Sequence, residues 1–419
     1  MASTIAEKIL ARASGKKEVK SGEIVDANID LAMSHDNTTL VSEIFKEIDK
    51  ENVWNSQRIV IVLDHRTPAN TITTAENHKL IREFVKKYNI KNFFDVGEGI
   101  CHQVLTEKGF IHPGMLIVGT DSHTTTAGAF GAFATGIGAT DMAAVWSTGK
   151  LWFKVPRTLG FDISGELSKY VTSKDIILYL IGKIGADGAN YKACEFYGDT
   201  IENMSIDSRM VISNQAMEAG AKAAIIPPDK KILDYLKLRD KESFEMIYSD
   251  QDAEYEKTFE FDITNTEPQI ACPDKINNVK PVSKLTGEKI NQAVLGSCTN
   301  GRLEDFAIAS DILKDKTISK KVRMIVVPAS RSVYLEAIKK GYIEIFLKAG
   351  AIIVNPGCGP CLGLHQGVLA DGESVISSTN RNYKGRMGAS GAEIYLGSPA
   401  TVAASAIKGE ITNPKDMIL

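Results

Sequence analysis

The sequence lacks a long apolar run. Stretches such as residues 59–63 are short beside the roughly 18 residues that a membrane-spanning helix needs. No membrane partner is therefore expected. Residues 1–19 mix Glu7, Lys8 and Arg12 with apolar side chains, which predicts a surface helix instead of a signal peptide. We therefore expect a cytoplasmic protein.

An excess of positive charge is also missing. Lysine and arginine number 49 against 52 aspartates and glutamates, so the formal net charge is −3. Tight binding to nucleic acid depends on basic groups that displace counterions, so no nucleic-acid partner is expected. The glycine-rich residues 128–131 lack the GxGxxG and GK[ST] patterns of phosphate loops, which argues against nucleotide binding.

Cysteine is scarce. The six cysteines in 419 residues are too few for a disulfide scaffold, and in a reducing compartment a close pair is more typical of a metal or catalytic site. The remaining composition, 43% hydrophobic and 24% charged, is that of a globular protein and excludes collagen-like and disordered classes. The length predicts two or three domains.

Short β-branched runs alternate with helical stretches along the chain. This pattern predicts an α/β fold with mainly parallel sheets, whose chemistry gathers at the carboxyl ends of the strands. We expect three domains, at 1–155, 156–285 and 286–419, and an irregular, charged connection over 230–289. The expected strands are 58–63, 92–95, 115–119, 291–295, 322–327 and 351–354, and the clearest helices are 74–87 and 330–340.

The densest group of glycine, proline and cysteine is residues 355–363, NPGCGPCLG, directly after an expected strand. Cys358 and Cys361 are spaced so that both sulfurs can bind one metal centre. Zinc would need two more soft ligands nearby, and a thioredoxin-like pair should open a helix, which Pro356 and Pro360 disfavour. An iron–sulfur site and a buried, inert pair remain as interpretations.

A second cysteine turn follows the expected strand 291–295. Cys298 lies there in GSCTNGR, residues 296–302. Alone it would be taken for a small buried apolar residue. Together with Cys358 and Cys361 it makes three thiolates without an evident fourth, which suggests a cluster with one iron left open. Such an iron can act as a Lewis acid.

Histidines paired with carboxylates occupy other polar turns. These groups can share protons, whereas isolated surface histidines would have no such role. A further loop, residues 377–386, carries two arginines that suit bidentate binding of carboxylates, although it could also be an exposed basic loop. The histidine groups are Asp64 with His65, Asp121 with His123, and Glu98 with His102, and the arginines are Arg381 and Arg386.

Together these segments resemble the aconitase family. The motifs GTDSHT (119–124), GSCTNGR (296–302), NPGCGPCLG (355–363) and TNRNYKGRMG (379–388) occur in the family's order, and the resemblance covers essentially the whole chain. It implies three α/β domains of aconitase type around a [4Fe-4S] cleft. Because the chain ends soon after the third of these, it resembles the large subunit of a split enzyme, with the swivel domain on a separate small subunit.

The resemblance also implies roles for individual residues. The cluster ligands would be Cys298, Cys358 and Cys361, with one iron not bound by protein. Asp64 would orient His65, which protonates the leaving hydroxyl, and Glu195 would be the carboxylate partner of His102. The catalytic base, a serine, and a further arginine would belong to the small subunit. Asp121 and His123 are expected to bind water and substrate, and Ser122, Asn380, Arg381 and Arg386 to bind substrate or cluster.

The expected reaction is reversible dehydration of a small hydroxy di- or tricarboxylate, without net redox chemistry. Isomerisation of isopropylmalate in leucine synthesis is the first expectation because that pathway is widespread. Homocitrate-type and dimethylmalate substrates are alternatives, since the large chain is a poor guide to the substrate side chain. An RNA-binding relative and a pure electron carrier are hypotheses of other classes: the net charge opposes the first, and the second needs a fourth protein ligand.

Overall fold

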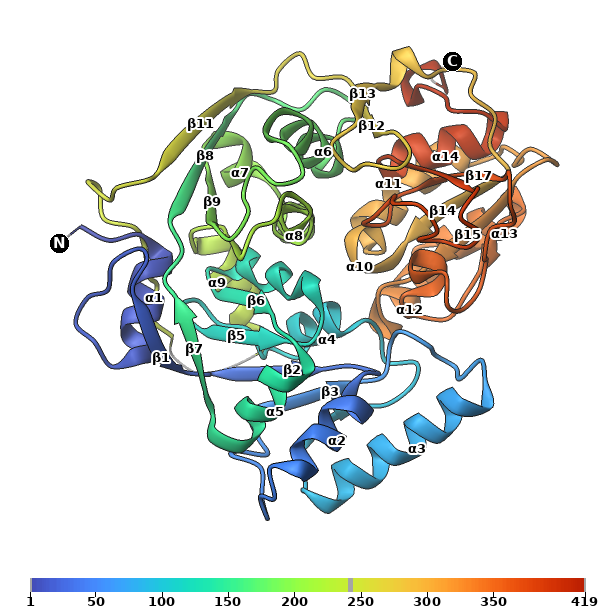
Figure 1. Cartoon of the computed structure of the whole chain (residues 1–419). Helices are drawn as coiled ribbons and strands as arrows, with labels where there is room; N and C mark the ends of the chain where they lie inside the picture. Colours follow the sequence, from blue (N-terminus) through green and yellow to red (C-terminus); the bar gives the residue numbers. More distant parts are fainter. Residues whose placement is uncertain (1, 240–243, 418–419) are drawn as a thin grey trace.

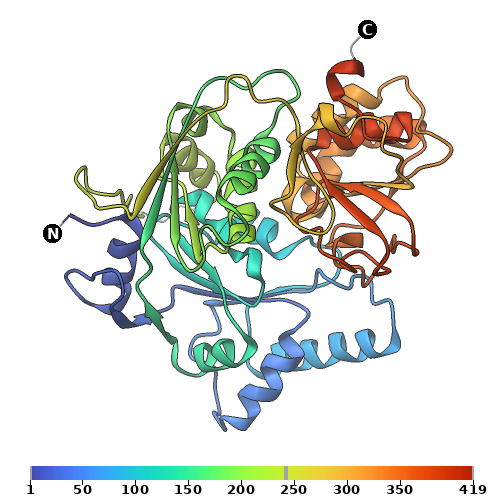
Figure 2. The ribbon, with the colours of Figure 1, turned by 45° about the horizontal axis from the view of Figure 1, so that its top comes forward.

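The computed structural model describes residues 2–239 and 244–417. Strands and helices alternate along these residues and form three largely parallel sheets. In Figure 1 the sheet nearest the N-terminus lies at the bottom, the second at the upper left and the third at the right, and Figure 2 shows the same three groups from another side. The predicted α/β class is confirmed.

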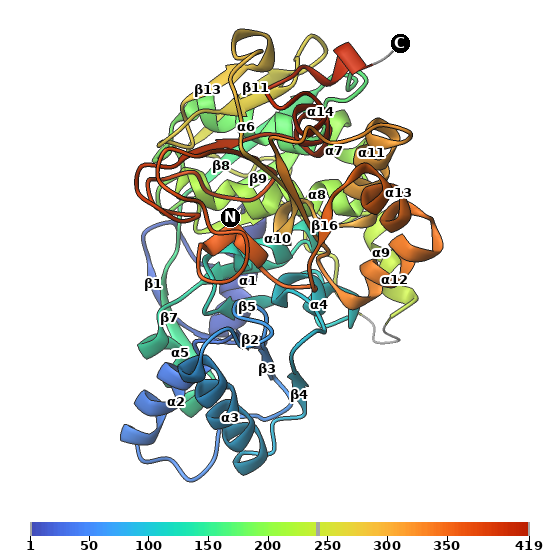
Figure 3. The same ribbon diagram turned by 90° about the vertical axis from the view of Figure 1, so that its right-hand side faces the viewer.

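The first sheet has five parallel strands in the order β4-β3-β2-β5-β6. Every residue of β2, β3 and β5 is buried, because these β-branched runs are covered on both faces. Helices α2, α3 and α5 cover one face, and α4 lies on the other (Figure 3). The bounds are β2 Leu31–Ser34, β3 Ile59–Val62, β4 Asn92–Phe94, β5 Leu116–Gly119, β6 Phe133–Gly136, α2 Thr38–Glu47, α3 Ile72–Lys87, α4 Cys101–Glu107 and α5 Ala139–Thr148.

The second sheet has four parallel strands in the order β10-β9-β8-β11. Its helix α8 packs against α6 and against a 3₁₀ helix, Ser122–Phe130, that follows β5 of the first sheet. Thus α8 joins the first two sheets. The bounds are β8 Thr158–Ser164, β9 Ala193–Tyr197, β10 Ala223–Ile225, β11 Lys257–Asp262, α6 Ser173–Ile184, α7 Asp199–Asn203, α8 Ile206–Gln215 and α9 Lys230–Lys237.

The third sheet has seven strands in the order β13-β12-β18-β17-β14-β15-β16. The five strands from β18 to β16 are parallel, and β12 and β13 add antiparallel pairs at one edge. Helix α10, directly after β14, contacts α8 of the second sheet. The bounds are β12 Gln269–Ala271, β13 Val279–Pro281, β14 Gln292–Gly296, β15 Arg323–Val327, β16 Ile352–Ile353, β17 Ser374–Ser377, β18 Glu393–Leu396, α10 Ser297–Asn300, α11 Leu303–Leu313, α12 Arg331–Lys339, α13 Tyr342–Ala349 and α14 Pro399–Lys408.

Two sequence predictions need correction. The expected irregular connection 230–289 contains α9, β11, β12 and β13, and the last two pair within the third sheet although they precede residue 286. Their short apolar segments are hidden among charged residues and prolines in the sequence. Helix α1 (Ile5–Ser14), expected at the surface, buries Ile5, Ile9 and Leu10 completely and leaves only its charged side toward solvent.

The remaining strands β1 (Ile24–Asn28) and β7 (Lys150–Lys154) form a separate antiparallel pair. In the described part of the chain, no helix combines the length and the apolar character that a membrane crossing requires.

Candidate active site

Three thiols lie in two turns at the carboxyl ends of strands of the third sheet. Cys298 lies in the turn just after β14. Gly296 in this turn has φ 133°, and a Cβ on it would lie 2.1 Å from the Val327 carbonyl oxygen, so only glycine permits the turn. Cys358 and Cys361 follow β16, and a 3₁₀ helix, Gly359–Leu362, carries the second of them. All three side chains are buried.

Two asparagines hold these sulfurs. The Asn380 amide donates to Cys298 Sγ (3.4 Å), and its Oδ1 accepts from Cys361 Sγ (3.4 Å). Asn214, at the end of α8, also donates to Cys298 Sγ (3.5 Å) and accepts from the Asn380 amide (2.6 Å). The second and third sheets therefore meet at the thiols.

The three sulfurs are not arranged as the ligands of one zinc ion. Two thiolates on one zinc ion lie about 3.8 Å apart, given Zn–S bonds of about 2.3 Å in a tetrahedron. Among the described residues, the group of possible metal ligands whose atoms all lie within 4.8 Å of one another is His35, Asp36, Asp64 and His65, so at least one pair of the three sulfurs is farther apart than that.

The turn after β3 brings an imidazole to the thiols. The main-chain oxygen of Asp64 accepts from the Cys358 N–H at 2.9 Å. His65 donates from Nδ1 to Asp64 Oδ1 (2.6 Å), and its Nε2 lies 3.2 Å from Asp121 Oδ2. Burial opposes its charge, but the Cys358 sulfur and these two carboxylates raise the pKa of His65 well above its usual value. The carboxylates of Asp64 and Asp121 thus flank the His65 ring, which lies beside Cys358.

The carboxylate of Asp121, in the turn after β5, contacts the imidazoles of three histidines. Besides His65, it lies 3.1 Å from His102 Nε2 and 3.4 Å from His123 Nδ1. Burial favours the neutral acid, but hydrogen bonds from His102, His123 and His65 hold the pKa of Asp121 well below its usual value. The carboxylate therefore stays ionised between the three rings.

A second ionic chain begins at His123. Its Nε2 donates to Glu218 Oε1 (2.8 Å), which also accepts from Arg381 Nε (2.7 Å). Arg381 reaches Ser122 Oγ at 2.9 Å with its outer nitrogen. Burial would raise the pKa of Glu218, but His123 and Arg381 lower it below its usual value. Glu218 and Arg381 also line a pocket of about 500 Å³, which gives this end of the site access to solvent.

Arg386 lies beside the cysteines with an unused donor. Its outer nitrogens contact Cys361 Sγ (3.8 Å) and the Tyr383 hydroxyl (3.1 Å), whereas its Nε is buried without a partner. Burial alone would raise the pKa of Cys361, but Arg386 and Asn380 outweigh it and lower that pKa. Burial raises the pKa of Cys298 and of Cys358. An anionic group beside Cys361 would find an available N–H.

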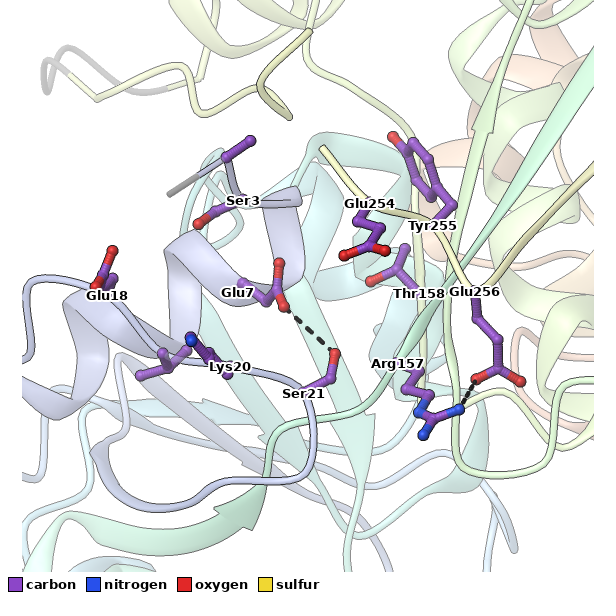
Figure 4. Close-up of a pocket in the computed structure, with 12 residues that line it drawn as sticks. Ser3, Glu7, Glu18, Lys20, Ser21, Arg157, Thr158, Glu254, Tyr255 and Glu256 are labelled. Carbon is purple, nitrogen blue, oxygen red and sulfur yellow. Dashed lines mark hydrogen bonds and ion pairs between the residues drawn. The ribbon is translucent and has the colours of Figure 1, made fainter. Parts of the chain in front are cut away.

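Glu195 is not part of this group, which corrects its expected pairing with His102. It lies on β9 and accepts from the Ile5 N–H (2.9 Å), Ser249 Oγ (2.6 Å) and the Tyr255 hydroxyl (2.7 Å), so it ties the start of α1 to the second sheet. Figure 4 shows Tyr255 lining a pocket of about 500 Å³ there, and the described residues around it include none of the thiols or histidines above.

The sequence analysis missed Glu218 and Asn214. They are four residues apart where α8 passes into the 3₁₀ turn Ala216–Ala219, so both lie on one side of this segment. No strand end or glycine-rich turn marks them, and this spacing was the only available signal. All other predicted site residues come together around the three thiols.

Comparison with known proteins agrees with this geometry. The model of the aconitase family (aconitate hydratase) matches residues 7–289 and 275–409. The chain belongs to the aconitase family. The predicted family is thereby confirmed.

Several relatives within the aconitase family match almost the full chain. The probable 3-isopropylmalate dehydratase large subunit of Methanothermobacter thermautotrophicus is 54% identical over 415 residues, 99% of each chain. The 3-isopropylmalate dehydratase large subunit of Halothermothrix orenii is 51% identical over 100% of both chains. The probable methanogen homoaconitase large subunit of Methanosarcina mazei is 55% identical over 390 residues, 93% of this chain and 99% of the relative.

Proposed function

We propose that this chain is the large subunit of a 3-isopropylmalate dehydratase, a hydro-lyase that interconverts 2- and 3-isopropylmalate by dehydration and rehydration. The observation that carries the proposal is the bond between the Asp64 oxygen and the Cys358 N–H, which sets the cationic His65 against the thiols. The names of relatives at about half identity support the same reaction.

We infer that Cys298, Cys358 and Cys361 hold a [4Fe-4S] cluster with one iron free of protein ligands. When bound, the cluster supplies a Lewis acid for the substrate hydroxyl and a carboxylate. The spacing of the sulfurs and their asparagine donors support this assignment. The other three cysteines are also free thiols, as a reducing compartment such as the cytoplasm, our proposed location, would keep them.

His65 acts as the general acid. Hydroxide is a poor leaving group, and a proton from imidazolium makes it leave as water. Asp64 fixes the ring through Nδ1, which leaves the proton on Nε2, the nitrogen that faces Asp121, as the one to donate. Both carboxylates lower the free energy of the cationic ring, so the proton is available at neutral pH.

Arg381, Ser122 and Arg386 bind the substrate carboxylates. Removing a proton next to a carboxylate builds up negative charge, which cationic donors must stabilise. Glu218 orients Arg381 by accepting from its Nε, so the outer edge of the guanidinium faces Ser122. The buried, unpartnered Nε of Arg386 is a second donor for the same purpose.

We propose a small subunit as the partner that completes the site. The named relatives are large subunits, and the family resemblance assigns the catalytic base to the swivel domain. The pocket beside Glu218 and Arg381 is open to solvent and would face that subunit.

A homoaconitase large subunit is the second candidate. Relatives with that name match this chain at 52% identity over 98% of its length and at 55% over 93%, close to the 54% over 99% of one dehydratase relative. The same cluster and acid would serve either substrate, because the two differ in the side chain that extends from the reacting carbons.

The test combines cysteine variants with a substrate panel. The chain is purified without oxygen with its small subunit, and iron and sulfide are counted for six Cys→Ala variants. We expect Ala at 298, 358 or 361 to abolish the cluster, and Ala at 101, 194 or 272 to retain it at a packing cost of about 1–3 kcal/mol. Turnover of isopropylmalate but not homoaconitate decides the substrate. Loss of the cluster in Cys272→Ala but not in Cys298→Ala would refute the ligand assignment.

A further inference from the structure

Lys174 is a buried cation near the thiols to which the proposed reaction gives no role. It lies in the first turn of α6 with a relative exposure of 0%. Its ammonium donates to the Thr379 carbonyl (2.6 Å) and to Gln215 Oε1 (3.0 Å), both neutral acceptors. Among the described side chains, no carboxylate oxygen forms an ion pair with it. A buried charge without a counter-ion is costly, so this lysine needs an explanation.

Two of the groups around Lys174 that can carry negative charge are sulfurs. Burial lowers the pKa of Lys174 to about 7, and Glu218, Cys298, Cys361 and Asp175 act in the opposite direction. Glu218 is already paired with His123 and Arg381. Asp175 accepts from the Thr172 and Gln269 N–H groups. The sulfurs are therefore the anions that remain for the ammonium once they are deprotonated.

The two acceptors of Lys174 are neighbours of the residues that hold sulfur. Thr379 precedes Asn380, which contacts Cys298 and Cys361, and Gln215 follows Asn214, which contacts Cys298. One ammonium thus ties the end of α8 to the loop after β17. These are the segments from the second and third sheets that meet at the thiols.

We propose that Lys174 is a buried counter-charge for the cluster, and that its two hydrogen bonds fasten the Asn214 and Asn380 segments around it. This proposal rests on the cluster assigned above. In the cluster-free chain the ammonium has only neutral hydrogen-bond partners, so its buried charge costs free energy. In the loaded chain three thiolates surround the cluster, and the ammonium offsets part of their charge.

The two states of the chain therefore give opposite predictions for Lys174→Met, which keeps the length of the side chain and removes its charge. Without a cluster, the variant should unfold at the same or a higher urea concentration than the wild type. With a cluster, it should lose iron to a chelator faster, by on the order of tenfold, because one nearby compensating charge is gone. Its midpoint potential, followed by electron paramagnetic resonance, should be lower, since the added electron meets less positive charge.

Lys222→Met is the matched control. Lys222 is partly buried, and the opposing charge near it is Asp141 instead of a sulfur. This variant should keep the wild-type rate of iron loss and potential. Should Met at position 174 prevent folding, Lys174→Gln, which keeps a donor for Thr379, replaces it with the same expectations.

Two results would contradict the role of Lys174, and a third would contradict the proposed function. Wild-type iron retention and potential in the Lys174 variants would overturn the counter-charge. Equal destabilisation of the cluster-free and loaded chains would also overturn it, because it would reveal a purely structural lysine. A wild-type chain that assembles no cluster at all would refute the proposed function itself, so the two failures are distinguishable.

Discussion

Asp121 shows how few residues set the charges of this site. One carboxylate faces His65, His102 and His123, so each ring is stabilised by an anion that is itself kept ionised by the rings. His102 and His123 are buried, and the side chains of His65 and Asp121 are only 12% and 14% exposed, so little water reaches these four groups. The pairing of Asp64 with His65 was predictable because the two are adjacent in sequence. The partner of His123 was not, since Glu218 lies 95 residues away.

Glu218, the carboxylate found at the site in place of Glu195, gives the first prediction. Glu218→Gln removes the anion shared by His123 and Arg381, so kcat/KM of the two-subunit enzyme should fall on the order of a hundredfold. The raised pKa of His123, supported by Asp121 and Glu218 against burial, should move down in an NMR titration.

Glu195→Gln is the control for Glu218→Gln. It should leave kcat within a few-fold of wild type, because the change is remote from the chemistry, and should destabilise the attachment of α1 by about 1–3 kcal/mol. The opposite pattern, an inactive Glu195 variant and an active Glu218 variant, would restore the original sequence prediction.

Arg381→Lys tests the planar fork of the guanidinium. Lysine keeps the charge but cannot contact Glu218 and Ser122 together, so kcat/KM should drop on the order of a hundredfold from misplacement of the substrate. Urea unfolding should change little. Arg82→Lys, at an exposed arginine that is bidentate to Asp95, is the matched control and should keep full activity. Unchanged kinetics at position 381 would make its loop an ordinary basic surface.

At the scale of elements, the predicted chemistry lies where parallel strands end. The turns after β3, β5, β14 and β16 each carry residues that the sequence analysis selected, because strand, glycine and polar turn follow one another in the sequence. Helix α8 is the exception. Its polar and apolar residues are buried alike and carry no motif, so only the fold places its end against the thiols. The edge strands β12 and β13 were missed for a related reason, since three-residue strands leave too short a pattern.

The turn after β3 has a support of its own in Asp36. This carboxylate accepts from the N–H groups of Asp64, His65 and Arg66 and from His78 Nε2 (3.0 Å). Burial would raise the pKa of Asp36, but His78 and these donors hold it well below its usual value. Because the folded pKa is lowered, the stabilisation is complete above the unfolded pKa of about 3.9 and is lost as the pH falls further.

Asp36→Asn should therefore lower the free energy of unfolding by about 1–3 kcal/mol at neutral pH, since four donors lose a charged acceptor. The difference from wild type should shrink as the pH falls below about 4, where Asp36 is protonated in the unfolded chain but stays ionised in the folded one. Urea unfolding between neutral and acid pH measures both effects. A difference that stays constant to acid pH would show that the charge of Asp36 contributes nothing.

At the scale of the whole molecule, the site exists only where the three sheets meet. Asp64, His65 and Asp121 come from the first sheet, Asn214, Glu218 and Lys174 from the second, and the thiols with Asn380 and both arginines from the third. Main-chain bonds such as the one from Cys358 to Asp64 hold these groups in register. The family motifs in the sequence identified most of the members, whereas their mutual distances follow from packing that no single segment encodes.

In the proposed function this assembly provides the acid and the donors that bind the substrate carboxylates, and the small subunit provides the base. A base on another chain cannot be replaced by repairing the cluster. We therefore expect the isolated chain, fully loaded with iron and sulfide, to show negligible dehydration of isopropylmalate, and the cognate small subunit to restore turnover in proportion to complex formed.

Exposure to air should then remove that activity, because an iron without a thiolate is held only by sulfide and exchangeable oxygen ligands and leaves first on oxidation. Iron and a reductant should bring the activity back without new protein. The measurement is turnover in an anaerobic chamber, followed in parallel with iron content before and after air. Oxygen-stable turnover by this chain alone would contradict both the open iron and the placement of the base on the small subunit. Activity that survives air only in the two-subunit complex would contradict the open iron alone.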